Sequence, residues 1–306
     1  MQNLRMLPKL RDSLTYAYIE HAIIDQKHQA IEYVNKEGRV MVPVANLCLL
    51  LLGPGTSITH AAIRTLMENG CAINWVGEDG MKFYAQGGGE TRKGYHLLHQ
   101  AKMASDPQKH MEVVTSMYRF RFNQSVDEDL SLPQLRGMEG VRVREAYADA
   151  SQKYGVKWSG RRYERSNWLG SDPINRALSA ANSLMNGLCQ SAIVSGGYST
   201  AIGFIHTGKQ LSFVFDVADL YKIDYCVPIA FEVVSQSSVD IEKRVRQACR
   251  EKFRDVKLLE RILPDIDDLL KIPAQFEGEF AADEDKALPE PLWGVYEEIE
   301  YGGDDP

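Results

Sequence analysis

The chain has 306 residues, of which 44% are hydrophobic and 25% are charged. This length and composition suffice for one large domain or two ordinary ones, and they exclude a disordered tail protein, a collagen-like repeat and a disulfide-stapled mini-domain. The net charge of −7 is unevenly distributed, because residues 276–306 contain eleven acidic residues and one lysine. The first 275 residues therefore carry +3, so the overall acidity does not exclude nucleic acid as a partner of this body.

Cysteine usage and hydropathy indicate the cellular compartment of the protein. The five cysteines are scattered singly with no CxxC pair, as is typical of reduced core residues in a cytosolic protein. The first residues lack the apolar core of a signal peptide, and the longest apolar run, Leu47–Leu52, is too short to span a bilayer. We therefore predict a cytoplasmic protein with no membrane association.

The first 86 residues predict a small β-rich domain. Residues 29–34 and 39–44 flank the turn 35–38 and predict a hairpin. Thr56 and Ser57 are candidate caps for a helix over His60–Glu68, which Asn69 and Gly70 would end. Further strands are expected over 47–52, 71–76 and 81–85.

The glycine-rich segment 87–94 predicts a linker, because three consecutive glycines cannot hold regular structure cheaply. Beyond it, apolar residues recur every three or four positions and predict a mostly helical domain over residues 95–273. Helices are expected over Tyr95–Ser105, Pro107–Phe122, Met138–Tyr154, Ile174–Ser195, Asp216–Val234, Val239–Phe253 and Leu258–Leu270. Residues 274–306 are expected to form a flexible acidic tail. The fold class predicted is α+β, with a β-rich domain over residues 1–86 followed by the helical domain.

One histidine and nearby carboxylates form a candidate metal site. His206 lies in a glycine-containing apolar segment, and Asp216 and Asp219 follow it, three residues apart at the expected start of a helix. One imidazole with carboxylates suits Mg²⁺ or Mn²⁺ better than a structural zinc site. The alternative is an aspartate that caps the helix and a histidine satisfied in the core.

Glu139 is a further candidate ligand, because it lies between two glycines and is bracketed by Arg136, Arg142 and Arg144. An exposed helix with surface salt bridges explains this pattern equally well.

Basic and aromatic residues alternate in two segments, which is typical of nucleic-acid binding because cations neutralise phosphates and aromatic rings stack on bases. The candidates in the two segments are Arg161, Arg162, Tyr163, Trp168, Arg246 and Arg250. For the second segment, solvated charge on a helix is the alternative.

Several segments in order resemble one family, the CRISPR adaptation integrase or first CRISPR-associated protein, in its type I-E branch. The resembling segments are PGTSITHAAIR, WVGEDGMKFYA, QLRGMEGVRVR, KYGVKWSGRRY, INRALSAANSLMNG, GFIHTGKQLSFVFDVADLYK and RQACREKFR. The resemblance covers roughly residues 5–270. It implies an N-terminal β-domain and a C-terminal α-domain.

The resemblance also implies residue roles. The family's metal ligands match Glu139, His206 and Asp219, with Asp216 as an accessory catalytic carboxylate. Residues that line the DNA path match Arg136, Lys209 and Lys222. His21 occupies the place of the aromatic residue that wedges open the DNA end, which is a departure from the family.

The activity implied is transesterification, in which the 3′-hydroxyl of a captured DNA fragment attacks a phosphodiester of the CRISPR array with the help of Mg²⁺ or Mn²⁺. The implied partners are double-stranded DNA, a second copy of the chain and a dimer of the companion second CRISPR-associated protein. A general metal-dependent nuclease and a non-catalytic DNA-binding scaffold are the alternatives. We expect the acidic tail to dock the companion or to compete with DNA.

Overall fold

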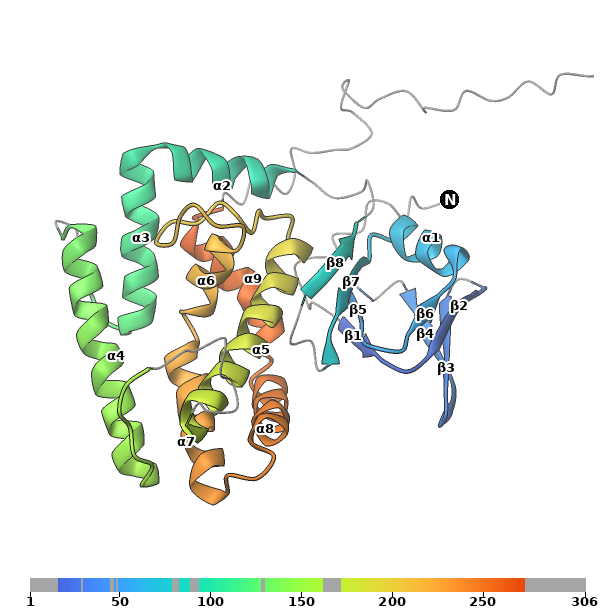
Figure 1. Ribbon diagram of the computed structural model, residues 1–306. Helices are drawn as coiled ribbons and strands as arrows, with labels where there is room; N and C mark the ends of the chain where they lie inside the picture. Colours follow the sequence, from blue (N-terminus) through green and yellow to red (C-terminus); the bar gives the residue numbers. More distant parts are fainter. Residues whose placement is uncertain are drawn as a thin grey trace, which may run out of the picture. The chain divides into compact units, whose positions relative to one another are not determined.

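A strand-rich part precedes a helical part in the computed structural model of the protein (Figure 1). The structure describes residues 16–28, 30–44, 47, 49–78, 83–88, 94–127, 130–161 and 172–272. The first part contains β1 (Tyr16–Ile19), β2 (Ile23–Lys27), β3 (Ala30–Asn35), β4 (Gly38–Pro43), β5 (Leu49–Leu52), β6 (Ser57–Ile58), α1 (His60–Glu68), β7 (Ala72–Val76) and β8 (Phe83–Gly87). The predicted hairpin is confirmed, because β3 and β4 pair antiparallel with Asn35 opposite Gly38.

The strands form two four-stranded sheets, in the orders β1-β5-β7-β8 and β4-β3-β2-β6. In the first sheet β5 is paired in parallel with both β1 and β7. Successive side chains of a strand point to opposite faces. Leu49 and Leu51 accordingly join the core of the helical part, whereas Leu50 and Leu52 join the core of the strand-rich part. Burial on both faces explains why β5 is an uninterrupted apolar run.

Helix α1 begins as predicted, but its expected caps were wrong. Thr59 is the N-cap, and its hydroxyl accepts a hydrogen bond from the backbone N–H of Ala62 at 3.2 Å. Ser57 instead lies in β6, which pairs in parallel with β2. The short strand ends only one residue before the helix, so the capping position moves to the residue between them.

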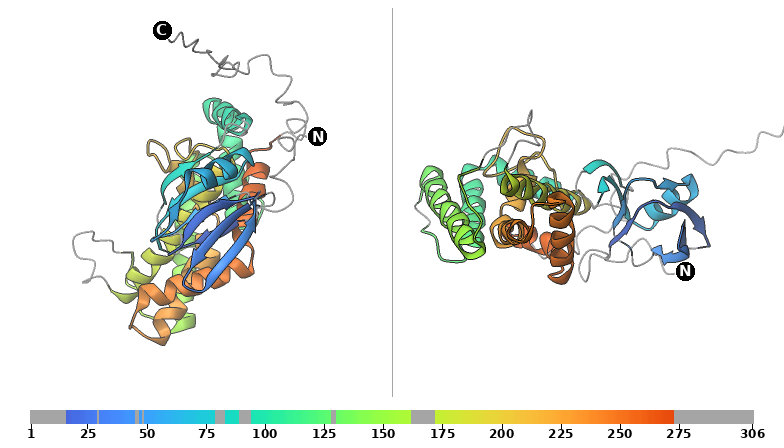
Figure 2. Two further views of the ribbon diagram at one scale, coloured as in Figure 1. Left: turned by 90° about the vertical axis from the view of Figure 1, so that its right-hand side faces the viewer. Right: turned by 60° about the horizontal axis from the view of Figure 1, so that its bottom comes forward.

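The second part is helical, which confirms the predicted α+β class. It contains α2 (Tyr95–Ser105), α3 (Pro107–Phe122), α4 (Leu132–Tyr154), α5 (Pro173–Ser195), α6 (Ser212–Ala218), a π-helical segment (Lys222–Cys226), α7 (Val227–Gln236), α8 (Ile241–Asp255) and α9 (Leu258–Leu269). Helix α5 is the centre of this part and packs against α6, α7, α8 and α9 (Figures 1 and 2). Its buried face includes Ala177, Ala181 and Gly187, whose small side chains allow neighbouring helices to approach closely.

Two predicted helices differ most from those in the structure. Helix α4 begins at Leu132, well before Met138, because Ser131 and Gln134 form a capping box at its start. The single helix expected over Asp216–Val234 was wrong, since this span is divided among α6, the π-helical segment and α7. The wide π-helical turn begins at Lys222, three residues after Asp219, and such interruptions of the helical repeat are frequent at functional sites.

Contacts divide the chain into residues 1–272 and residues 273–306. The acidic tail and its predicted flexibility lie outside the described residues. Among the helices that the structure describes, none is long and apolar enough to cross a membrane.

Candidate active site

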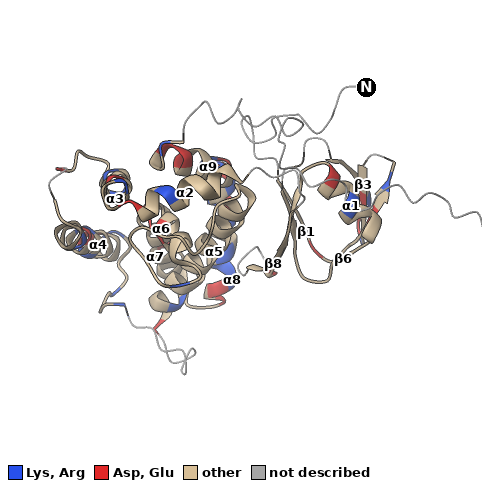
Figure 3. Ribbon diagram, turned by 90° about the horizontal axis from the view of Figure 1, so that it is seen from above, with Lys and Arg blue, Asp and Glu red and all other residues tan. Residues whose placement is uncertain are grey.

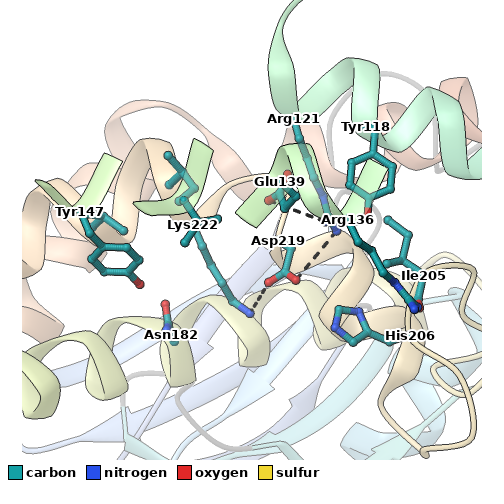
Figure 4. A pocket seen from close by; sticks show the side chains of 13 residues that line it. Tyr118, Arg121, Arg136, Glu139, Tyr147, Asn182, Ile205, His206, Asp219 and Lys222 are labelled. Atoms are coloured by element: carbon teal, nitrogen blue, oxygen red, sulfur yellow. Dashed lines mark hydrogen bonds and ion pairs between the residues drawn. The ribbon is translucent and has the colours of Figure 1, made fainter. Parts of the chain in front are cut away.

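Side chains from several separate elements line a pocket of about 490 Å³ in the helical part (Figure 4). Arg121 comes from the last turn of α3, Glu139 from the middle of α4, and Asp219 from the end of α6. His206 comes from the irregular loop between α5 and α6. The remaining lining residues are Tyr118, Arg136, Val143, Tyr147, Asn182, Ile205, Lys222, Ile223 and Val227.

The Glu139 carboxylate is largely buried, and the neighbouring arginines balance its charge only weakly. Its Oε1 lies 3.9 Å from Nη1 of both Arg121 and Arg142, which is too far for a hydrogen bond. Its Oε2 is buried and has no hydrogen-bond partner among the described residues. Burial raises the pKa of this carboxyl above its ordinary value, although the two arginines act in the opposite direction. A buried carboxylate oxygen without a partner is costly, and a ligand could satisfy it.

Asp219 is held in its charged form. Burial alone would raise its pKa, but the positive charge of Lys222 and then that of Arg121 outweigh burial and hold the pKa below its ordinary value. The Nζ of Lys222 donates to Oδ1 at 2.7 Å, and Nη2 of Arg121 lies 3.9 Å from Oδ2 (Figure 4). Arg121 therefore lies between the carboxylates of α4 and α6.

Asp216 holds His206 rather than facing the pocket. Its side chain is fully buried, and its Oδ2 accepts the backbone N–H groups of Phe204 at 2.6 Å and Ile205 at 3.1 Å. Its Oδ1 accepts the backbone N–H of His206 at 2.9 Å and pairs with the imidazole Nδ1 at 2.7 Å. These four bonds occupy the acceptor positions of the carboxylate. The alternative interpretation of Asp216 as a helix cap is wrong, since it lies inside α6.

This pairing determines how His206 can act. A carboxylate only accepts hydrogen bonds, so Nδ1 carries the proton and Nε2 of the neutral ring keeps its lone pair. The His206 side chain is 44% exposed and is therefore not the satisfied core histidine of the alternative interpretation. A carboxylate behind an imidazole is the usual arrangement that orients a metal-binding histidine.

The structure places the remaining predicted residues in different surroundings. Arg136 and Lys222 line the pocket, and Nη2 of Arg136 donates to the carbonyl of Ile205 at 2.9 Å. Lys209 is exposed on the loop that follows His206, outside the pocket lining.

Three predicted DNA-binding residues lie elsewhere. Arg161 donates from Nη1 to Asn175 and from Nη2 to the Ser179 hydroxyl at 2.9 Å, so its guanidinium is bound to the first turns of α5. Arg246 and Arg250 lie on α8 and do not line the pocket. Figure 3 shows blue Lys and Arg positions on this helix.

His21 lies in the strand-rich part, where it lines a second, open cavity of about 400 Å³ together with Gly55. Its backbone has a positive φ of 50°, and its N–H donates to the carbonyl of Pro54 at 2.9 Å. Arg162, Tyr163 and Trp168 lie outside the described residues.

Sequence reasoning missed four polar lining residues: Tyr118, Arg121, Tyr147 and Asn182. For Arg121 a signal was present. Val114, Met117, Tyr118 and Arg121 recur at three- and four-residue spacing and share the buried face of α3. An arginine on an apolar helix face needs a buried anionic or carbonyl partner, and Nη2 of Arg121 indeed donates to the carbonyl of Asp216 at 3.1 Å.

In the pocket, the candidate metal-binding carboxylates lie beside positively charged side chains. Within the described residues, no three His, Cys, Asp or Glu side chains already form a group that could hold a metal ion. Asp219 is engaged by Lys222, and that ammonium would have to release Oδ1 before another cation could bind there.

Comparisons with known proteins assign the family. A family model described as CRISPR associated protein Cas1 matches residues 16–127 and 119–250. The chain is 51% identical to the CRISPR-associated endonuclease Cas1 2 of Thermus thermophilus, over 100% of this chain and 95% of the relative. It is 44% identical to the CRISPR-associated endonuclease Cas1 1 of Rhodospirillum rubrum, over 86% of each.

A solved structure with the same family name supports this assignment. It is described as a TtCas1-DNA complex, and it matches with a TM-score of 0.80 and 52% identity, covering 87% of this chain and all of that one. The residues that the family model matches include the strands β1–β8 and the helices that carry the pocket. The chain therefore belongs to the Cas1 family.

Proposed function

We propose that this protein is a divalent-metal-dependent DNA endonuclease and integrase of CRISPR adaptation, which joins 3′-hydroxyl ends of captured DNA to the CRISPR array. The observation that carries the proposal is the pocket in which Glu139, His206 and Asp219 meet, although they are far apart in the sequence. The endonuclease names of the relatives and the DNA complex of a similar chain support it.

Mg²⁺ or Mn²⁺ fits the chemistry of these residues. Two carboxylates and one imidazole are suitable donors for a hard divalent cation, and the buried Oε2 of Glu139 has no hydrogen-bond partner among the described residues. Glu139, His206 and Asp219 would hold the ion. When bound, such an ion lowers the pKa of an attacking hydroxyl and stabilises the charge that develops at phosphorus.

The protein's own residues prepare the pocket for a phosphodiester. Asp216 keeps the proton of His206 on Nδ1, so that Nε2 remains a donor atom for a cation. Arg136 and Lys222 supply positive charge beside the carboxylates, where it can bind phosphate oxygens. The nucleophile belongs to the DNA, which is consistent with the absence of serine and cysteine among the described residues that line the pocket.

The remaining roles extend the proposal to the DNA path and the assembly. Double-stranded DNA is the proposed substrate, with Lys209, Arg246 and Arg250 as contacts to its backbone and His21 near its end. Arg161, Arg162, Tyr163 and Trp168 are proposed to contact DNA as well. We also propose a cytoplasmic location, a homodimer and a complex with a dimer of the companion second CRISPR-associated protein.

A strand-transfer assay tests the proposal. The full chain, with and without its companion, is mixed with a short 3′-hydroxyl duplex and a supercoiled CRISPR plasmid in Mg²⁺, Mn²⁺ or EDTA. We expect joining that needs metal and the companion and is abolished by His206→Ala and Asp219→Ala. His60→Ala and Asp268→Ala are the matched controls, because these exposed residues lie outside the pocket.

Two outcomes would favour the alternatives. Metal-dependent cutting without joining would indicate a general nuclease that uses the same pocket. DNA binding without either reaction, unchanged in Asp219→Ala, would indicate a scaffold.

A further inference from the structure

The loop that carries His206 is irregular and is held by side chains from other elements. It runs from Gly196 to Leu211, between α5 and α6. Backbone N–H and C=O groups in such a loop need partners, because no helix or sheet supplies them. Asp216 supplies acceptors for the end of the loop near His206.

Gln100 on α2 supplies partners for the earlier part of the loop. Its side-chain Nε2 donates to the carbonyls of Ser199 at 3.0 Å and Ile202 at 2.8 Å. Its Oε1 accepts the backbone N–H of Ser199 at 2.8 Å. Both donor hydrogens of the amide and one of its acceptor positions are therefore used on this loop.

The burial of Gln100 is informative. The buried residues of α2 are His96, Gln100 and Met103, which share one helix face, and Gln100 is completely inaccessible to solvent. Burying an amide is unfavourable unless its hydrogen bonds are made, so an apolar side chain would be the simpler way to pack this face. His96 has a similar function, because its Nδ1 pairs with the carbonyl of Gly196 at 2.6 Å.

Packing transmits the position of this part of the loop to His206. Only three residues separate Ile202 from His206, and Gly203 lies between them. A Cβ at Gly203 would overlap the backbone oxygen of His206 and would lie 2.8 Å from Cβ of Ser212. The backbone at Gly203 thus packs directly against that of His206 and has little space in which to adjust.

We infer that Gln100 is a positioning residue for His206: its amide fixes the loop so that Nε2 of His206 points into the pocket. The inference rests on the proposed function, since it assigns Gln100 to the presentation of a metal-binding imidazole. Gln100 touches neither the pocket nor the other candidate ligands. Its effect on metal binding passes entirely through the loop.

Calorimetric titration of the full chain with Mn²⁺ tests the inference, in parallel with thermal denaturation. Gln100→Met keeps the shape of the side chain and removes all three hydrogen bonds. We expect the Kd for Mn²⁺ to rise by about 10- to 100-fold, the usual effect of losing a residue that orients a metal ligand. Gln100→Asn keeps a buried amide but shortens it by one methylene, and it should weaken binding in the same direction.

Asn175→Leu is the matched control. Asn175 is also a buried amide that fixes a loop, because its Nδ2 donates to the carbonyl of Gly160 at 3.1 Å and its Oδ1 accepts from Arg161. That loop does not carry His206. Asn175→Leu should therefore lower the Tm and leave the Kd for Mn²⁺ unchanged, whereas a purely structural role of Gln100 would affect both amides alike.

The outcomes separate the inference from the proposed function. Wild-type protein that binds no Mn²⁺ would contradict the proposed function. Wild-type binding together with unchanged affinity in Gln100→Met, or in Gln100→Asn if the first variant does not fold, would overturn only the role of Gln100. An equal loss of affinity in the Gln100 variants and in Asn175→Leu would overturn it as well.

Discussion

Replacing Asp216 with asparagine is expected to disturb His206 without changing the size of the side chain. The carboxylate accepts two hydrogen bonds on each oxygen, from three backbone N–H groups and the imidazole. In asparagine one of the two oxygens becomes an NH₂ group, which donates. Whichever way the amide is oriented, two of the four donors lose their acceptor.

The two orientations have different consequences. If the amide oxygen faces Phe204 and Ile205, the NH₂ group faces His206, and the imidazole can respond by moving its proton from Nδ1 to Nε2. Nε2 would then no longer bind a metal ion. If the oxygen faces His206, the N–H groups of Phe204 and Ile205 are left without an acceptor in a buried site. Each lost bond to a charged group is worth about 1.5–3 kcal/mol, so we expect a total loss of about 3–6 kcal/mol.

Urea denaturation and Mn²⁺ titration of Asp216→Asn measure both consequences. Asp265→Asn is the matched control, because Asp265 accepts one hydrogen bond, from the Tyr221 hydroxyl at 2.7 Å, which an amide oxygen can also accept. We expect Asp216→Asn to lose stability and Mn²⁺ affinity, and Asp265→Asn to retain its affinity. A free energy of unfolding within about 1 kcal/mol of wild type, together with normal Mn²⁺ affinity, would refute this reasoning. A change of that size is no larger than the contribution of a single neutral hydrogen bond.

Three further perturbations test the electrostatics of the pocket and the tail. Burial raises the pKa of Glu139, so between the usual carboxyl pKa and the raised one the folded protein keeps a proton that the unfolded chain releases. The stability of the wild-type protein should therefore fall as the pH rises through this range. Glu139→Gln should remove this fall in stability and raise the Tm at neutral pH in EDTA. A Tm difference between Glu139→Gln and wild type that does not change with pH would contradict this prediction. Arg121→Met should lower the free energy of unfolding in urea by about 3–5 kcal/mol, because it removes the cation that Glu139 and Asp219 share, and Arg121→Lys should cost less. A chain that ends at Pro273 should assemble less with the companion protein, and equal assembly and integration would exclude a role for the acidic tail.

Local patterns in the sequence were sufficient for most of the elements. The β3–β4 hairpin and helices α3, α5 and α9 follow from alternation, turn residues and three- to four-residue spacing, which depend on neighbours along the chain. Strand β1 was not assigned, because it pairs in parallel with β5 and the stability of that pairing comes from distant residues. Strand β2 was not assigned either, although it pairs antiparallel with the adjacent β3. The π-helical segment after Asp219 has no periodic signature and was interpreted as a continuous helix.

In the candidate site too, the sequence indicated some features and only the tertiary structure showed the others. Residue types in the sequence nominated His206 with Asp216 and Asp219, and Glu139 as a further candidate. The resemblance to the family then selected Glu139, His206 and Asp219 as the metal ligands. Only the tertiary structure placed Arg121 between two carboxylates and turned Asp216 away from the pocket onto the His206 loop. Burial and hydrogen-bond partners decide between a ligand and a positioning residue, and both depend on elements that the sequence keeps far apart.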